Sequence, residues 1–255
     1  MPDYRSFFVP DEIEPSSVSL DPDESHHLVA VNRVQRGDTV VAFDGRGNEW
    51  ICECIDPDKR RALLKVRFHQ RVDPLPYRIT LAQAVPKGRS MDSIIRKATE
   101  IGAIRIAPLY SERTEVRLEK EREEQKVTKW RNSAVEAAKQ SGNAHLPEIL
   151  PPQTARSFME SVAPEYNLKL VASLQSGARP LRSILSEYQA EHGQLPVEVL
   201  WMVGPEGDFT PAEMSISKNM VFEPVTLGPL VLRCETAAIY ALSILSYELQ
   251  QGQTH

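Results

Sequence analysis

The chain has 255 residues, of which 41% are hydrophobic and 25% are charged, and its formal net charge at pH 7 is -5. This length and composition predict one or two globular domains with ordinary buried cores. The acidic balance excludes a uniformly basic nucleic-acid protein, and no apolar run reaches membrane-spanning length. Residues 1–15 carry acids where a signal peptide has basic residues. We therefore expect a cytoplasmic protein with no membrane partner.

Local charge and cysteine spacing are more informative than the totals. Residues 76–145 carry 14 Lys and Arg against 9 Asp and Glu, whereas residues 1–75 carry 10 against 14 and residues 146–255 carry 6 against 12. A local positive surface neutralises phosphates even on an acidic protein, although an exposed charged helix is a commoner origin of such an excess.

The cysteines have no zinc-ligand spacing, so we interpret them as reduced and structural and expect no metal site. They are Cys52, Cys54 and Cys234.

Short apolar runs separated by turns fill the beginning of the chain. Strand-like runs occupy residues 7–10, 38–45, 49–55 and 61–68, and residues 26–38 have apolar positions at helical spacing. These elements predict a small β-barrel. The polar, proline-rich segment Gln70–Tyr77 is the best candidate linker. We therefore expect a barrel domain at residues 1–72 and a second domain at residues 73–255.

From Arg78 onward the pattern changes to strands that alternate with helices. This alternation predicts an α/β domain with a parallel sheet covered by helices on both faces. The last helix, after Arg233, is apolar around much of its circumference, so we expect it to be buried in the sheet or against a second subunit. Strands are predicted at 78–85, 104–109, 168–174, 197–203 and 223–227, and helices at 89–101, 118–141 and 181–190.

Two Gly-Pro corners follow predicted strands of this domain, one at Gly204–Asp208 and one at Gly228. Glycine lets the main chain approach a ligand closely, and Pro205 fixes its own φ. Thr210, followed by Pro211 and Glu213, has the pattern of an N-cap, a first-turn proline and a capping-box carboxylate. Ligands of parallel sheets bind where strands end, so we expect both corners to hold a ligand.

Four segments in this order resemble the signature blocks of the bacterial small-subunit ribosomal RNA uridine N3-methyltransferases. The segments before them, residues 26–38 and 44–48, are similar to the first domain of that family, so the likeness covers nearly the whole chain. Four ordered blocks are far more specific than any one of them. They are PKGRSMDSIIRKATEIG at 86–102, KWRNSAVEAAKQSG at 129–142, GPEGDFT at 204–210 and LGPLVLRCETAAIYAL at 227–242.

The resemblance implies a knotted methyltransferase. Its fold is an N-terminal PUA-like, RNA-binding β-barrel followed by an α/β domain with a deep trefoil knot. It also implies that S-adenosyl-L-methionine is the cofactor, that the protein works as a homodimer, and that N3 of one uridine in 16S ribosomal RNA of the small ribosomal subunit is methylated. Two alternatives stay open: a noncatalytic RNA-binding or ribosome-assembly protein, and a knotted methyltransferase with a transfer RNA target.

The chain departs from the family pattern at four positions. The family usually has arginine where this chain has Leu230 and often where it has Asn143, and these losses bear on RNA contact more than on the cofactor. Asp208 replaces a commoner glycine, and Cys234 a commoner threonine.

The resemblance and the strand ends together select candidate site residues. Uracil N3 must lose a proton, so Glu206 is a candidate base, and Arg233 is a candidate to stabilise negative charge on the uracil oxygens. Equally supported alternatives make Glu206 an acceptor of backbone N–H groups and Arg233 an ion-pair partner of Glu235. The cofactor candidates are Leu174, Gly204, Pro205, Gly207, Leu227, Gly228 and Leu232.

Basic residues of both domains are candidates for RNA contact. Arg89, Arg96 and Lys97 share one predicted helix and make a candidate phosphate surface, although a solvated helix face is the commoner origin of such a cluster. Arg33 of the first domain is a further candidate. The resemblance also assigns Glu136, Lys139 and Gln140 to the shape of the site or to the dimer contact.

Overall fold

The computed structural model describes residues 4–10, 15–114, 120–161 and 165–250. The chain divides into two compact units. Unit 1 contains residues 1–74 and 135–146, and unit 2 contains residues 75–134 and 147–255. The linker predicted at residues 70–77 spans the first break. The sequence did not indicate that residues 135–146 group with unit 1.

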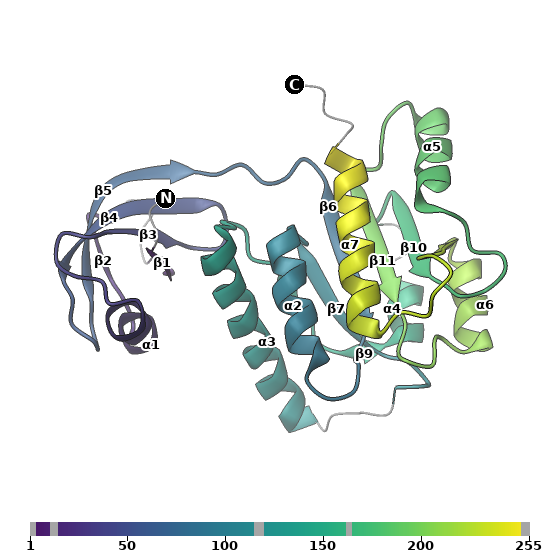
Figure 1. Cartoon of the computed structure of the whole chain (residues 1–255), viewed down its shortest axis with the longest axis horizontal. Coiled ribbons are helices and arrows are strands. Elements are labelled where there is room, and N and C mark those ends of the chain that lie inside the picture. Colours follow the sequence, from purple (N-terminus) through teal and green to yellow (C-terminus); the bar gives the residue numbers. More distant parts are fainter. Residues whose placement is uncertain (1–3, 11–14, 115–119, 162–164, 251–255) are drawn as a thin grey trace. The chain divides into compact units, whose positions relative to one another are not determined.

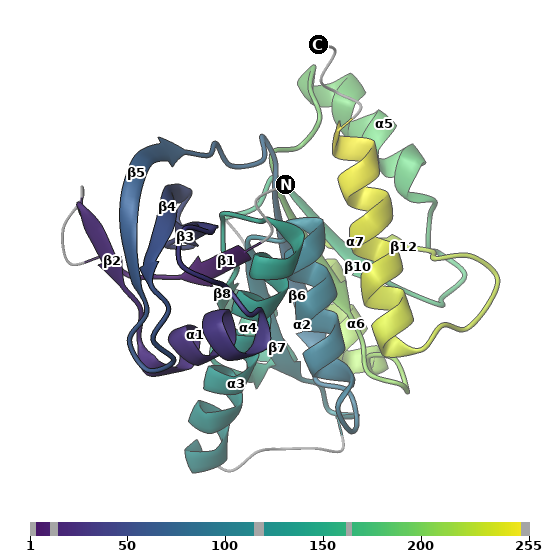
Figure 2. The same ribbon diagram turned by 60° about the vertical axis from the view of Figure 1, so that its left-hand side comes forward.

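Unit 1 is built on one five-stranded sheet in the order β1-β3-β4-β5-β2 (Figure 2). β1 runs parallel to β3, and the remaining pairs are antiparallel. The core on one face includes Trp50 and Leu64, which are buried. The predicted strands at 38–45, 49–55 and 61–68 are confirmed. The strands are β1 (Tyr4–Phe7), β2 (Ser17–Ser19), β3 (Thr39–Phe43), β4 (Asn48–Asp56) and β5 (Leu63–Arg71).

A short helical segment connects β2 to β3. α1 (Pro22–His26) begins at Asp21, whose side chain accepts the N–H of Glu24, and it continues into the π-helical turn η1 (His27–Val31). The helix predicted at residues 26–38 therefore begins earlier and ends sooner. It ends because Arg33 takes a left-handed backbone conformation with φ 59°.

Unit 2 contains a parallel sheet in the order β12-β10-β11-β6-β7-β8, with β9 also paired to β7. The predicted parallel sheet is confirmed. β8 and β9 were not predicted because strands of two residues show no periodicity. The strands are β6 (Arg78–Ala84), β7 (Arg105–Tyr110), β8 (Glu148–Ile149), β9 (Gln153–Thr154), β10 (Leu168–Ala172), β11 (Glu198–Val203) and β12 (Glu223–Val225).

Helices cover both faces of this sheet, because its strands alternate buried side chains between two cores. Trp201 packs in the core that contains residues of α2, α3, α5 and α7, whereas its neighbour Met202 packs in the core that contains residues of α4 and α6. α2 and α7 run side by side (Figure 1). The helices are α2 (Ser90–Ile101), α3 (Lys120–Ser141), α4 (Ala155–Ser161), α5 (Leu181–His192), α6 (Pro211–Asn219) and α7 (Cys234–Gln250).

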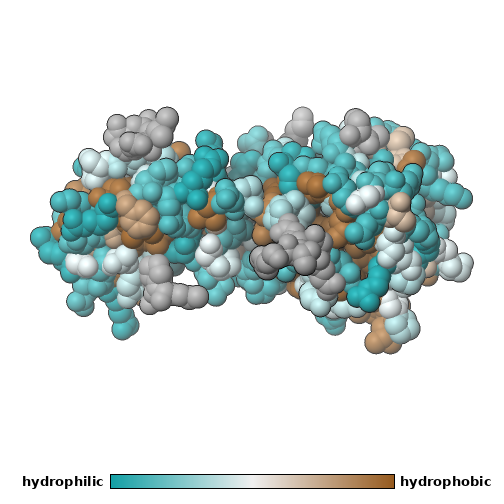
Figure 3. Space-filling view, turned by 90° about the horizontal axis from the view of Figure 1, so that it is seen from above, coloured by the Kyte–Doolittle hydropathy of each residue, from teal (hydrophilic) through white to brown (hydrophobic). Residues whose placement is uncertain are grey.

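Within the described ranges, no helix has the length and apolar content needed to cross a membrane. All three cysteines are buried free thiols. No group of three or more potential metal ligands gathers among the residues that the structure places. Figure 3 shows a face covered mostly by hydrophilic side chains, with apolar side chains in small patches.

Candidate active site

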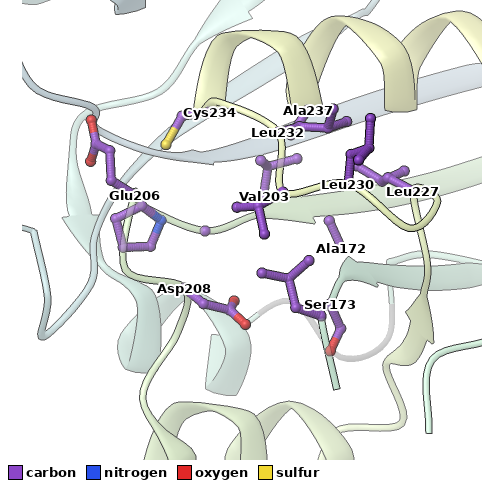
Figure 4. A pocket seen from close by; sticks show the side chains of 14 residues that line it. Ala172, Ser173, Val203, Glu206, Asp208, Leu227, Leu230, Leu232, Cys234 and Ala237 are labelled. Carbon is purple, nitrogen blue, oxygen red and sulfur yellow. The ribbon is translucent and has the colours of Figure 1, made fainter. Parts of the chain in front are cut away.

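A hollow of about 520 Å³, open solvent included, lies at the carboxyl ends of three strands of unit 2 (Figure 4). β10 pairs with both β11 and β12, so the segments that leave these strands meet at one edge of the sheet. Residues 172–174, 203–208 and 227–232 contribute to the lining, together with the start of α7.

Most of the predicted cofactor residues line this hollow. Leu174, Gly204, Pro205, Leu227 and Leu232 do so, whereas Gly207 and Gly228 lie next to lining residues without being part of the lining. A Cβ on Gly204 would come within 3.3 Å of atoms of Asp208 and Phe209, which is a tight approach. Gly228 has φ 108°, a conformation that residues with a Cβ rarely adopt.

Large apolar side chains are exposed around the hollow. Leu174 is 61% exposed, Leu230 72% and Val231 77%. All three belong to the lining. Apolar groups left open to water around a concave site are typical of a surface that a ligand covers. Leu230, which stands in place of the family arginine, is therefore part of an apolar wall.

The Glu206 carboxylate is exposed and has a defined hydrogen-bond partner. It accepts the backbone N–H of Lys87, which follows β6, at 3.1 Å. Burial first, and the Glu206 and Glu235 carboxylates second, raise the pKa of the Cys234 thiol to about 12. The hydrogen bond from Lys87 agrees with the alternative in which Glu206 accepts a backbone N–H. Its role as a base remains a proposal.

Arg233 immediately precedes α7 and is exposed. Its backbone carbonyl accepts the N–H of Ala237 at 2.8 Å, and its side chain does not line the hollow. In the described part of the chain it makes no ion pair with Glu235, so the alternative of a structural partnership is not observed.

Asp208 adopts a left-handed conformation with φ 61°, which explains why a glycine is compatible with this position. Its Oδ1 accepts the N–H of Phe209 at 2.7 Å. In Figure 4 the Asp208 carboxylate and the Ser173 hydroxyl occupy the polar part of the hollow, below Val203 and Leu232. The hollow therefore combines apolar walls with a carboxylate.

A buried network supports the corner loop from the side of β7, and the sequence indicated only part of it. The capping box of Thr210 and Glu213 is confirmed. In addition, the buried Glu213 carboxylate accepts the hydroxyl of Ser111 and the N–H of Glu112, both at 3.0 Å. The Arg113 guanidinium donates to the carbonyl of Gly207. Ser111 directly follows β7 and Arg113 comes two residues later, at the edge where the other strands end, and this position was the available sequence signal.

The RNA candidates are exposed and lie on different units. Arg96 and Lys97 lie on α2, with Arg89 just before it, and Lys97 pairs with Glu100 at 2.7 Å. Arg33 belongs to unit 1. The structure thus brings three of the four candidates onto one helix and its start.

Glu136 and Lys139 lie in the part of α3 that belongs to unit 1. The Lys139 ammonium pairs with Glu24 at 2.8 Å and with Glu136 at 2.5 Å, and Glu136 lies 3.5 Å from His27. These contacts stabilise unit 1 and involve no residue of the hollow.

Comparison with known proteins places the chain in a family. A model of the RNA methyltransferase domain matches residues 73–246, and a model of the RNA methyltransferase PUA domain matches residues 20–67. The chain belongs to the family of ribosomal RNA small subunit methyltransferase E. The PUA match agrees with unit 1 as the predicted PUA-like domain, and the longer match covers the sheet and the hollow.

Relatives from distant bacteria cover nearly the whole chain. The ribosomal RNA small subunit methyltransferase E of Synechocystis sp. is 34% identical over 248 residues, which are 97% of this chain and 78% of the relative. That of Bacillus subtilis is 30% identical over 240 residues, which are 93% and 92% of the two chains.

Solved structures of similar proteins contain a ligand. A putative methyltransferase of Legionella pneumophila in complex with bound S-adenosylmethionine has a TM-score of 0.85 at 30% identity and covers 96% of this chain and 97% of its own. A ribosomal RNA small subunit methyltransferase E of Neisseria gonorrhoeae bound to S-adenosyl methionine has a TM-score of 0.84 at 30% identity, with coverage of 96% and 98%.

Proposed function

We propose that this protein transfers a methyl group from S-adenosyl-L-methionine to N3 of a uridine in 16S ribosomal RNA. The observation that carries the proposal is the hollow formed by the two Gly-Pro corners in a member of this family. Similar structures bound to S-adenosylmethionine support the cofactor, and the names of the relatives support ribosomal RNA as the substrate. The resemblance of the four sequence blocks supports uridine N3.

The residues of the hollow fit this cofactor. Its adenine is flat and largely apolar, and the exposed Leu174, Leu230 and Val231 offer apolar surface for it to cover. Its sulfonium and ammonium groups are cations, and Asp208 supplies a carboxylate to the lining. Backbone groups at the strand ends are available for polar contacts, because the glycine corners keep side chains away from them.

The cofactor supplies an electrophilic methyl group, so the protein has to position the uracil and manage one proton. Glu206 is our candidate base, although its carboxylate already accepts the Lys87 N–H, and its release from that hydrogen bond would accompany proton transfer. Arg233, exposed at the start of α7, is our candidate for stabilising negative charge on the uracil oxygens. A target uridine within folded RNA has to be unstacked before it reaches either group.

The remaining partners follow the same proposal. Arg33, Arg89, Arg96 and Lys97 are exposed cations suited to phosphate contact. A second copy of the chain would cover the exposed aromatic side chains of α7, and a homodimer is therefore expected. We further infer a trefoil knot in unit 2 and a cytoplasmic location. The exposed aromatic residues of α7 are Tyr240 and Tyr247.

Nucleoside analysis of the reaction product tests the proposal. Small ribosomal subunits from cells that lack this enzyme are incubated with the protein and labelled S-adenosyl-L-methionine. The RNA is then digested, and its nucleosides are identified by mass spectrometry. We expect 3-methyluridine from 16S RNA. A ribose-methylated nucleoside, or labelling of transfer RNA supplied in a parallel incubation, would support the alternative target. Absence of any labelled RNA, with RNA still bound, would support the noncatalytic alternative.

The matched variants for this assay are Glu206→Gln and Arg233→Ala. A full methylation rate in Glu206→Gln would remove that carboxylate as the base, and a full rate in Arg233→Ala would remove the guanidinium from the reaction. Lys218→Ala, at the exposed end of α6, is the control for loss of a charge elsewhere in unit 2.

A further inference from the structure

A buried carboxylate holds the loop after β7 against the Gly204–Thr210 corner. Glu213 is 2% exposed. Its oxygens accept the Ser111 hydroxyl at 3.0 Å, the Glu112 N–H at 3.0 Å and the Thr210 N–H at 2.9 Å. Burying a carboxylate is costly unless its oxygens are hydrogen-bonded, and these three donors meet that requirement. Two loops far apart in sequence are thereby fixed to each other.

The same network fixes the backbone of Arg113 and leaves its side chain exposed. The Arg113 N–H donates to the Ser111 hydroxyl oxygen at 3.2 Å, and the Thr210 hydroxyl donates to the Glu112 carboxylate at 2.9 Å. The loop is closed by a hydrogen bond from the Ser111 N–H to Thr114 Oγ1 at 2.9 Å. A loop restrained at each of its residues pre-organises whatever side chain it presents.

The Arg113 side chain lies along Gly207. In the sequence, Gly207 stands between Glu206 and Asp208, which both line the hollow. One guanidinium nitrogen donates to the Gly207 carbonyl, and a Cβ on Gly207 would lie 3.4 Å from Arg113 Cδ. A guanidinium has five N–H donors. Within the described ranges its contact with Gly207 is the one hydrogen bond of this side chain, so further donors face solvent at the edge of the hollow.

The charges at this edge require a cation if RNA is to approach. Glu206 and Asp208, on either side of Gly207, both line the hollow, and two carboxylates repel a phosphate or an anionic uracil. Arg113 contacts the residue between them. A planar, permanently charged guanidinium is well suited to bind an anionic oxygen.

We propose that Arg113 contacts an anionic oxygen of the substrate RNA at the edge of the hollow, and that Glu213 positions it. The inference rests on the proposed function and adds a substrate contact to it. If the oxygen belongs to a phosphate, the affinity for RNA depends on Arg113. If it belongs to the reacting uracil, the turnover rate depends on Arg113.

The test compares Arg113→Ala and Arg113→Lys with the wild type and with Arg182→Ala. The Arg182 side chain is 73% exposed and pairs with Glu248, outside the loops of the hollow, so this variant controls for loss of one surface arginine. Three quantities are measured separately: the Kd for S-adenosyl-L-methionine by calorimetry, the Kd for undermodified small ribosomal subunits at several salt concentrations, and the turnover rate.

A phosphate contact predicts that Arg113→Ala weakens RNA binding about tenfold and reduces the salt slope by about 0.7–0.9. A uracil contact predicts unchanged RNA affinity and a turnover rate reduced by about 10²-fold, by analogy with the loss of one preorganised donor. In both cases the cofactor Kd stays within about twofold of wild type, and Arg113→Lys recovers part of the loss.

Two results would overturn the inference. In one, Arg113→Ala leaves both RNA affinity and turnover unchanged. In the other, it weakens cofactor binding by the same factor as turnover, which would make Arg113 only a support for the corner loop. Glu213→Gln should reproduce the Arg113→Ala pattern in weaker form. If the wild type binds RNA without methylating it, the proposed function fails, and the RNA affinities of the variants still decide the role of Arg113.

Discussion

The contact between Lys139 and Glu24 should be among the strongest side-chain interactions of unit 1. The Lys139 ammonium lies 2.8 Å from a Glu24 oxygen, and the two side chains are only 5% and 12% exposed. The other Glu24 oxygen accepts the N–H of Phe7 at 3.1 Å. The pair therefore joins the end of α3 to α1 and β1, and its removal tests whether residues 135–146 are an integral part of this unit.

The expected magnitude follows from distance and burial. At 2.8 Å and an effective dielectric constant of about 20, Coulomb attraction amounts to about 6 kcal/mol. Desolvation of both charges opposes much of this. Lys139 also keeps a second partner, Glu136, at 2.5 Å when Glu24 is lost. We therefore expect a coupling energy of about 2 kcal/mol in a cycle of Glu24→Gln and Lys139→Met, and a loss of about 3 kcal/mol for Lys139→Met alone.

The assay has to report unit 1 by itself, because a two-unit chain is not expected to unfold in one transition. The protein has three tryptophans, and Trp50 is the one within the core of unit 1. Labelling with 5-fluorotryptophan gives Trp50 its own ¹⁹F resonance, whose native intensity is followed through a urea titration. The control cycle removes the exposed Arg67–Glu53 pair of unit 1, in which the arginine side chain is 51% exposed, and should give a much smaller coupling energy. A Lys139–Glu24 coupling as small as the control would refute the reasoning.

Two further predictions concern the hollow and the cysteines. Leu230→Arg replaces a side chain that is 72% exposed, so the free energy of unfolding should change by less than about 0.5 kcal/mol. The new arginine should steepen the salt slope of RNA binding by about 0.7 if it reaches a phosphate. An unchanged slope would contradict a role for this position in RNA contact. Burial raises the pKa of the Cys52 thiol from 9.0 to about 12, so the folded state holds this proton more tightly than the unfolded state. The resulting stabilisation is complete below pH 9.0 and is lost as the pH rises toward about 12, by about 1.4 kcal/mol per pH unit. Comparing urea unfolding of the wild type and Cys52→Ala between about pH 8 and pH 11 measures it, and parallel pH profiles would contradict it.

The sequence predicted what depends on local pattern. The apolar runs of β3, β4, β6, β10 and β11 were recognised because they are long enough to show strand composition. The N-terminus of α6 was recognised because Thr210, Pro211 and Glu213 are adjacent in sequence and form the capping box. The edge of the sheet where the hollow lies followed from the alternation of strands and helices, since parallel strands end on the same side.

The sequence did not predict what depends on contacts between distant segments. Glu213 is a capping residue by its spacing, but its bond to Ser111 joins positions 102 residues apart. The same holds for the Lys139–Glu24 pair, which spans 115 positions and lies within unit 1. Short strands such as β8 carry no periodic signal of their own, because pairing with β7 creates them.

Calorimetric titration with S-adenosyl-L-methionine tests the central claim most directly. The wild type is compared with a Gly204→Val and Gly228→Val double variant, which places a side chain in a tight approach at one corner and forces an unfavourable φ at the other. Gly193→Val is the control, because Gly193 has φ 75° at the end of α5 and does not line the hollow. We predict binding by the wild type and the control and none by a folded double variant. No binding by the wild type, or equal binding by the double variant, would contradict a cofactor site built from these two corners.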